Sequence, residues 1–121
     1  MFLKVLSDEI QSLLTSTDAI NSKTITLARS LILSLLAYFK DGLQYRELKA
    51  TLKISDGKLI SNLNNLKIMG YIKKEVVELN NKQLDVYFLT EEGEREINKI
   101  TDWMELIIKV VQLGEKNARE F

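Results

Sequence analysis

The chain has 121 residues, of which 45% are hydrophobic, and its 17 Lys and Arg balance its 17 Asp and Glu. This length supports a single domain with its own core, and no apolar run is long enough to span a bilayer. The absence of Cys excludes disulfides and thiolate metal sites, and the absence of His removes the commonest metal ligand and general base. We therefore expect a cytoplasmic protein that is not an enzyme and carries no metal or cofactor.

A net charge of zero argues against binding nucleic acid through a general positive surface, but the charges are unevenly distributed. Residues 40–82 carry nine basic against five acidic side chains, whereas residues 91–121 carry five against eight. This asymmetry predicts a binding surface in the middle of the chain and a separate role for its end.

Three helices are predicted in the first half of the chain. Over residues 2–14, apolar residues recur three and four positions apart and predict an amphipathic helix. Its apolar stripe consists of Leu3, Leu6, Ile10 and Leu13. The second helix, from about residue 24 or 25 to residue 40, is apolar around most of its circumference and should lie at the centre of the core. The third is predicted over residues 44–52, where Gln44 stands at the position expected for a Ser or Thr cap and Glu47 supplies half of a capping box.

Residues 55–70 contain the most informative pattern of the chain. Apolar residues at Leu59, Leu63 and Leu66 form one stripe, between a capping Ser55 and a terminating Gly70. We therefore predict a helix over residues 56–69. Because only three residues separate it from the preceding helix, the two form a helix-turn-helix.

The outer face of this helix is polar and contains no carboxylate. It consists of Gly57, Lys58, Ser61, Asn64 and Asn65, with Asn62 at its edge. Asn can pair bidentately with adenine, Lys donates to guanine, and Ser can donate or accept. Gly at a helix start leaves room for a phosphate. This composition favours a helix that reads base edges, although an ordinary solvated helix surface is the alternative.

Alternating β-branched and aromatic residues predict a β-hairpin over residues 72–89. Its register depends on whether the turn has two residues, Asn80-Asn81, or three, with Lys82 included. The two-residue turn would place charged and apolar side chains on the same face. We favour the three-residue loop, because one face of the hairpin could then pack against the core while the other face remains exposed to solvent.

A long helix is predicted to follow, with Thr90 as its N-cap and acidic residues in its first turn. Its apolar residues form two adjacent stripes. One stripe can pack within the chain, while the other needs a partner, either the first helix or a second copy of the chain. The residues that we expect at a dimer interface are Ile97, Ile100, Trp103, Met104, Ile107 and Val111.

An ordered set of motifs runs over about residues 29–97 and comprises Arg29, Ile32-Leu33, Leu36, Tyr45, Glu47-Leu48, Leu52, Ser55-Asp56-Gly57, Leu59, Leu63, Leu66, Gly70-Tyr71-Ile72, Leu89-Thr90 and Gly93. This set resembles the small dimeric winged-helix transcriptional regulators of archaea and bacteria, related to the MarR-like and ArsR-like proteins. The resemblance implies a mainly α fold with a small β-hairpin, namely a winged helix-turn-helix.

The resemblance also implies how such a protein would bind double-stranded DNA. Helix 56–69 would enter the major groove, and the wing over residues 72–89 would touch the backbone or minor groove. Segments 1–20 and 91–118 would flank a winged-helix core over 24–90 and form a homodimer. The implied DNA-binding residues are Lys53, Gly57, Lys58, Ser61, Asn62, Asn65, Lys73, Lys74 and Lys82.

The sequence departs from the family pattern in two places. Relatives often have Gly where Lys53 stands in the turn, and a left-handed Lys there would cost on the order of 1 kcal/mol. Relatives also often carry Ser and His at the positions of Ile60 and Asn62, so their base preference does not transfer to this chain.

Taken together, these features predict a sequence-specific DNA-binding transcriptional regulator, a repressor acting as a homodimer. The alternative is a winged-helix module that binds another protein, which the neutral charge and the acidic residues of the wing favour. An architectural role without sequence preference would require a more basic surface than this chain has. Whether a small molecule is sensed stays open.

Overall fold

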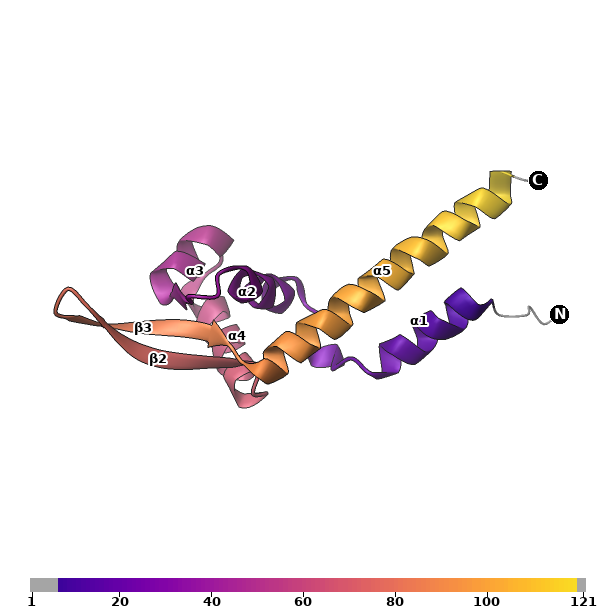
Figure 1. Cartoon of the computed structure of the whole chain (residues 1–121). Helices are drawn as coiled ribbons and strands as arrows, with labels where there is room; N and C mark the ends of the chain where they lie inside the picture. Colours follow the sequence, from indigo (N-terminus) through magenta and orange to yellow (C-terminus); the bar gives the residue numbers. More distant parts are fainter. Residues whose placement is uncertain (1–6, 120–121) are drawn as a thin grey trace. The chain divides into compact units, whose positions relative to one another are not determined.

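The computed structural model describes residues 7–119, which form five α-helices and one three-stranded antiparallel sheet (Figure 1). The elements are α1 (Asp8–Asp18), η1 (Ser22–Thr24), α2 (Leu27–Tyr38), β1 (Leu43–Gln44), α3 (Tyr45–Leu52), α4 (Asp56–Ile68), β2 (Ile72–Leu79), β3 (Lys82–Leu89) and α5 (Glu91–Arg119). They divide into two compact units, one of residues 22–97 and the other of residues 1–21 and 98–121. The predicted fold class, a mainly helical winged helix-turn-helix, is confirmed.

The core of the 22–97 unit is built from the apolar stripes of its three helices. Its most deeply buried side chains include Ile32, Leu33, Leu48, Leu59, Leu63 and Leu66, each at most 1% exposed. Helix α2 is shorter than predicted, because Thr26 caps it by accepting a hydrogen bond from the Arg29 amide at 3.1 Å. Because its predicted leucine stripe is buried in this core, α4 leaves its opposite side outside the core.

The predicted helix-turn-helix is formed by α3 and α4. Lys53 ends α3 in the left-handed conformation, with φ 55° and ψ 39°, as the comparison with related sequences implied. Ser55 then caps α4 by accepting a hydrogen bond from the Lys58 amide at 3.2 Å. The tight turn thus requires a left-handed residue, and Lys occupies it.

The wing, formed by β2 and β3, has a different register from the one that we favoured. Val77 lies opposite Leu84 and Leu79 opposite Lys82, so the turn consists of two residues, Asn80-Asn81. The three-residue loop is therefore wrong. Both Asn residues have positive φ, 53° and 63°, as a type I′ turn requires, and Asn tolerates this conformation well.

Packing does not oppose this register because the outer half of the wing has no buried face. Val76 and Leu79 are 63% and 55% exposed, whereas Ile72 and Val86, near the base of the hairpin, are buried. The assumption that one whole face of the hairpin packs led to the wrong prediction. The turn chemistry sets the register here.

Strand β1 was not predicted from the sequence. Its two residues, Leu43 and Gln44, pair with Tyr87 and Val86 of β3, which gives the strand order β1-β3-β2. A strand of two residues is too short to show an alternating pattern. Gln44 leads directly into α3, and its amide donates to the Glu47 carboxylate at 2.9 Å, as the predicted capping box requires.

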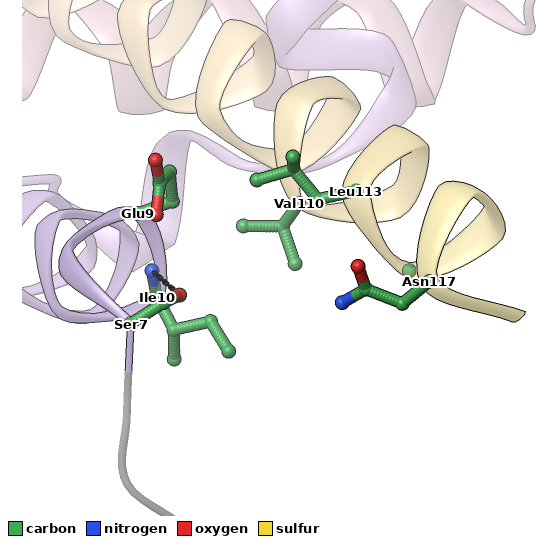
Figure 2. A pocket seen from close by; sticks show the side chains of 7 residues that line it. Ser7, Glu9, Ile10, Val110, Leu113 and Asn117 are labelled. Atoms are coloured by element: carbon green, nitrogen blue, oxygen red, sulfur yellow. Dashed lines mark hydrogen bonds between the residues drawn. The ribbon is translucent and has the colours of Figure 1, made fainter. Parts of the chain in front are cut away.

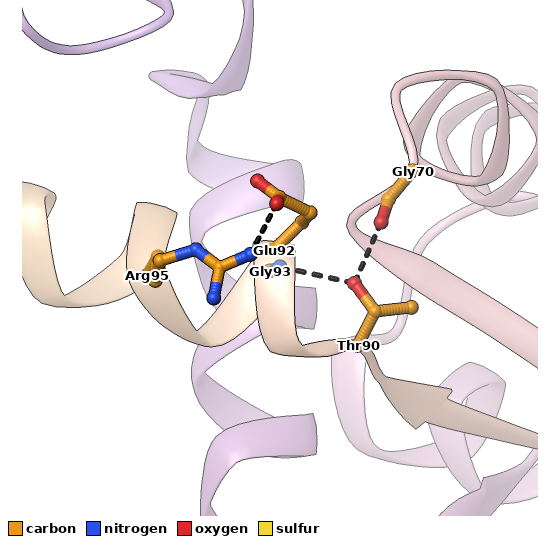
Figure 3. A network of polar contacts seen from close by, with 5 residues as sticks. All are labelled: Gly70, Thr90, Glu92, Gly93 and Arg95. Atoms are coloured by element: carbon orange, nitrogen blue, oxygen red, sulfur yellow. Dashed lines mark hydrogen bonds and ion pairs between the residues drawn. The ribbon is translucent and has the colours of Figure 1, made fainter.

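Thr90 joins the wing to the start of α5 (Figure 3). Its hydroxyl donates to the Gly70 carbonyl at 2.6 Å and accepts from the Gly93 amide at 3.0 Å, while its own amide donates to the Tyr71 carbonyl at 3.0 Å. The predicted cap is confirmed. A Cβ on Gly93 would lie 2.0 Å from the Tyr71 carbonyl oxygen, so this position requires glycine.

In the other unit, α1 spans Asp8–Asp18 and so extends beyond the predicted end at residue 14, while residues 2–6 of the predicted helix lie outside the described residues. Ser7 caps the helix by accepting from the Ile10 amide, and near the C-terminal end the Thr17 hydroxyl donates to the Leu13 carbonyl at 2.7 Å. Trp103 of α5 donates its indole N–H to the Thr17 hydroxyl at 2.8 Å. The predicted stripe residues Leu3 and Leu6 lie outside the described residues. Within residues 7–119, no helix combines the length and apolarity needed to cross a membrane.

Candidate nucleic-acid interface

The side of α4 that faces away from the core carries most of the predicted base-reading residues. Gly57, Lys58, Ser61 and Asn64 are exposed there, and no described atom lies within 4 Å of the Cβ position of Gly57. Ile68, on the same side near the end of the helix, is 82% exposed. Apart from Ile68, this surface presents short polar groups and one cation, which suits hydrogen bonding to base edges.

Asn62, also predicted to contact bases, is held by hydrogen bonds within the protein. Its Oδ1 accepts from Nε of Arg29 at 2.9 Å, and its Nδ2 donates to the Lys58 carbonyl at 2.8 Å. Arg29 also donates through Nη1 to the Lys23 carbonyl at 2.7 Å. Arg29 is the only charged residue of α2, and a lone cation in an apolar helix is the signal that could have pointed to a polar partner.

Asn65 lies one turn further along the same flank of α4. It is half-buried and lines a hollow of about 230 Å³ together with Lys23, Arg29, Ile68 and Met69. Two cations therefore stand beside an amide at the edge of the outer face. Such a hollow can accept a negatively charged group. In a helix that binds in a DNA groove, the nearby groups of this kind are the backbone phosphates.

Asp56, the first residue of α4, carries a carboxylate and was not among the predicted site residues. Asp56 accepts from the Tyr45 hydroxyl at 2.6 Å and lies 3.4 Å from Nζ of Lys49. The Tyr45 hydrogen bond, followed by Lys49, holds the pKa of Asp56 below its usual value. The same hydrogen bond raises the pKa of Tyr45 to about 12. This cluster ties the start of α4 to α3 and partly offsets the negative charge of Asp56.

Two of the predicted phosphate-binding cations of the wing form ion pairs within the hairpin. Nζ of Lys73 lies 2.9 Å from the Glu75 carboxylate and 5.7 Å from the centroid of the Phe88 ring, and Nζ of Lys74 lies 3.9 Å from Asp85. A phosphate would have to compete with these carboxylates. Lys82, at the end of the hairpin, is exposed.

The six residues predicted at a dimer interface differ in exposure. Ile97 and Ile100 are buried, at 6% and 0%, and offer little further area to a partner. Met104 and Val111 are 42% and 54% exposed, while Trp103 and Ile107 are half-buried. Ile108, which was not predicted, is 56% exposed. Apolar surface is therefore available on α5 beyond Ile100.

A second hollow, of about 380 Å³, lies between the start of α1 and the end of α5 (Figure 2). Its walls are mainly apolar, with Ile10 on α1 facing Val110 and Leu113 on α5, and polar groups from Glu9 and Asn117 at its edge.

No part of the described chain gathers three or more side chains of the kinds that hold a metal ion.

Comparisons with known proteins agree with this geometry. The family model of the winged helix DNA-binding domain matches residues 28–108, more than half of the chain. Comparison with curated protein sequences gave no match.

Several solved structures share the fold. The MepR–DNA complex of S. aureus is 18% identical over 91% of this chain and 84% of that chain, with a TM-score of 0.66. The transcriptional regulator Tm0710 of Thermotoga maritima is 20% identical over 90% and 78%, with a TM-score of 0.64. The YusO protein of Bacillus subtilis is 15% identical over 92% and 82%, with a TM-score of 0.63. Identities this low establish the shared fold and nothing more specific. The family itself rests on the matched model, and the chain belongs to the winged helix DNA-binding domain family.

Proposed function

We propose that this protein is a sequence-specific transcriptional regulator that binds double-stranded DNA as a homodimer. The observation that carries the proposal is the polar outer face of α4, which exposes Lys58, Ser61 and Asn64 on the second helix of a helix-turn-helix. In helix-turn-helix proteins this helix lies in the major groove. MepR, whose fold this chain shares, has been solved in complex with DNA.

The proposed contacts divide into base-reading and phosphate-binding groups. Lys58, Ser61 and Asn65 read bases, because their side chains supply the donors and acceptors that distinguish base edges in the major groove. The phosphates are bound by the cations of the turn and the wing and by the open helix start. These phosphate-binding residues are Lys53, Gly57, Lys73, Lys74 and Lys82.

The homodimer uses the apolar residues of α5 that remain exposed. Met104, Ile108 and Val111 recur at spacings of four and three, so they form one stripe along the helix. An exposed apolar stripe of this kind is stabilised when it packs against a second copy. Two copies related by a two-fold axis would place their α4 helices in successive major grooves, so each half-site lies about one helical turn from the other.

The winged-helix core over residues 24–90 acts as the DNA-binding part. Bound across a promoter, such a dimer excludes the polymerase, so we propose repression.

The proposal is tested by titrating a fluorescent duplex with the protein at several salt concentrations, together with sedimentation equilibrium. Binding should weaken steeply with salt, and Lys53→Ala should reduce the slope of log K against log salt by about one. Lys40→Ala, which removes another exposed lysine of the same unit, is the matched control and should leave the slope unchanged. The chain should sediment as a dimer, and Met104→Glu should shift it toward monomer. Absence of DNA binding at low salt would reject the proposal.

A second candidate is a winged-helix module that binds another protein. The ion pairs of Lys73 with Glu75 and of Lys74 with Asp85 favour it, because they reduce the positive field of the wing. A module of this kind would not be retained on bulk DNA at low salt. Retention on DNA–cellulose therefore separates the two functions.

A further inference from the structure

Three hydrogen bonds connect the segment before α2 to the flank of α4. Nη1 of Arg29 donates to the Lys23 carbonyl at 2.7 Å, Nε of Arg29 donates to Oδ1 of Asn62 at 2.9 Å, and Nδ2 of Asn62 donates to the Lys58 carbonyl at 2.8 Å. We call this chain the Arg29 clasp. It spans residues 35 positions apart in sequence, since Lys23 and Lys58 stand at its two ends.

The hydrogen-bonding groups of the Arg29 clasp are suited to keeping α4 in a fixed orientation relative to the start of α2. A guanidinium has its donors fixed in one plane, so two bonds made at once define the position of the group that accepts them. Both side chains of the central bond are half-buried, and a hydrogen bond from a charged donor is stronger than a neutral one. Asn62 uses one acceptor position of Oδ1 for Arg29 and one amide hydrogen for its own helix, so these two bonds fix the orientation of the amide and leave only its second lone pair and second hydrogen for any other partner.

From these contacts we infer that Arg29 and Asn62 are positioning residues and that Asn62 does not read a base. The clasp fixes the rotation and height of α4 relative to the start of α2. It acts on the flank that carries Lys58 four residues before Asn62 and Asn65 three residues after it, which places both on the same side of the helix. The side chains that read bases are thereby aimed by a residue that lies outside the helix-turn-helix.

This inference rests on the proposed function, because it concerns how α4 is aimed at DNA. It gives Asn62 a different role from the predicted base contact, which residue type alone suggested. Mutating a positioning residue should affect DNA recognition differently from mutating a residue that contacts a base. A lost base contact relaxes one base pair, whereas a lost positioning contact weakens discrimination at every base pair that the helix reads.

The test compares Arg29→Lys, Asn62→Ala and the double variant on a duplex selected from random sequence and on its single-base-pair variants. Lys cannot make both Arg29 bonds in the same plane, and Ala removes both bonds of Asn62. Each single variant should lower discrimination between the selected duplex and its variants by about tenfold at several adjacent base pairs. The double variant should lose no more discrimination than the single variant that loses more. Asn98→Ala, which removes an exposed amide side chain from α5, is the matched control for amide loss and should leave discrimination unchanged.

Asn62→Asp keeps the test decisive if the other variants fold poorly. Asp retains the acceptor for Nε of Arg29 and loses the amide donor, so the clasp predicts an unchanged order of base preferences with a uniform loss of affinity. A changed preference at one base pair in Asn62→Asp, with Arg29→Lys leaving all preferences intact, would show that Asn62 reads that base and overturn the inference. Additive losses in the double variant would overturn it as well.

A measurement on the free protein separates this inference from the proposed function. The Nε proton of Arg29 should exchange slowly with solvent in the wild type and faster in Asn62→Ala. If the wild type prefers no duplex but this proton is protected, the proposed function fails and the clasp stands as a feature of the fold alone. Fast exchange in the wild type would overturn the clasp whatever the DNA results.

Discussion

Replacing Gly93 by Ala should destabilise the protein strongly, and the structure indicates by how much. The new methyl carbon would lie 2.0 Å from the Tyr71 carbonyl oxygen, 2.7 Å from Cδ1 of Leu89 and 2.9 Å from the Tyr71 carbonyl carbon. The Tyr71 oxygen cannot simply move away, since it accepts the Thr90 amide at 3.0 Å. Overpacking of this kind costs about 1–3 kcal/mol, and a broken backbone hydrogen bond adds about 1 kcal/mol.

The helical preference of Ala over Gly offsets up to about 1 kcal/mol of this loss, so we expect a net destabilisation of roughly 2–3 kcal/mol. For a chain of this size, the melting temperature should fall by roughly 10 °C. Thermal unfolding followed by circular dichroism, at one fixed protein concentration, measures this shift.

Gly114→Ala is the matched control because Gly114 lies in the same helix with no described atom within 4 Å of its Cβ position. That variant should gain up to about 1 kcal/mol from helical preference alone. The two substitutions should therefore have opposite signs. A Gly93→Ala protein as stable as the wild type would refute the packing of the wing against the first turn of α5.

Three further predictions concern the proposed interface and its supports. Gly57→Ala should raise the melting temperature slightly, since its Cβ position is open, and weaken DNA binding in the same titration because the methyl group obstructs an approaching phosphate. Asp56→Asn should destabilise at pH 7. Because the folded-state pKa of Asp56 is lowered, its stabilisation is present above the unfolded pKa and lost as the pH falls through the folded one, so melting curves of the two proteins should converge only below about pH 4. Lys82→Ala should lower the salt slope of DNA binding by about one, whereas Lys73→Ala should lower it less because Glu75 already pairs with Lys73.

The sequence predicts α4 well because three independent signals coincide there. The leucine stripe, the Ser55 cap and the helix end before Gly70 all mark the same segment, and the observed helix, Asp56–Ile68, ends one residue before the predicted bound. The long helix after Thr90 is identified for the same reason. Helices are found where a local cap and a periodic stripe agree.

What the sequence misses depends on contacts between distant positions. The bond between Arg29 and Asn62 joins residues 33 positions apart, and the Tyr45–Asp56 bond joins two different helices. The prediction that Asn62 reads bases therefore rests on residue type alone, whereas the positioning role proposed above rests on its bond with Arg29. The hairpin register failed for another reason: we gave the expected packing of one face more weight than the preference of Asn80-Asn81 for a two-residue turn, and that face is not buried.

Selection of the wild-type protein on random duplex DNA at near-physiological salt tests the central claim most directly, namely that two copies of α4 read DNA from successive major grooves. The account predicts recovery of an inverted repeat whose half-sites are centred about 10 bp apart. Salt-sensitive retention without enrichment of any sequence would contradict base reading by α4 and leave only backbone binding. Recovery of a single, unrepeated half-site would contradict the dimer.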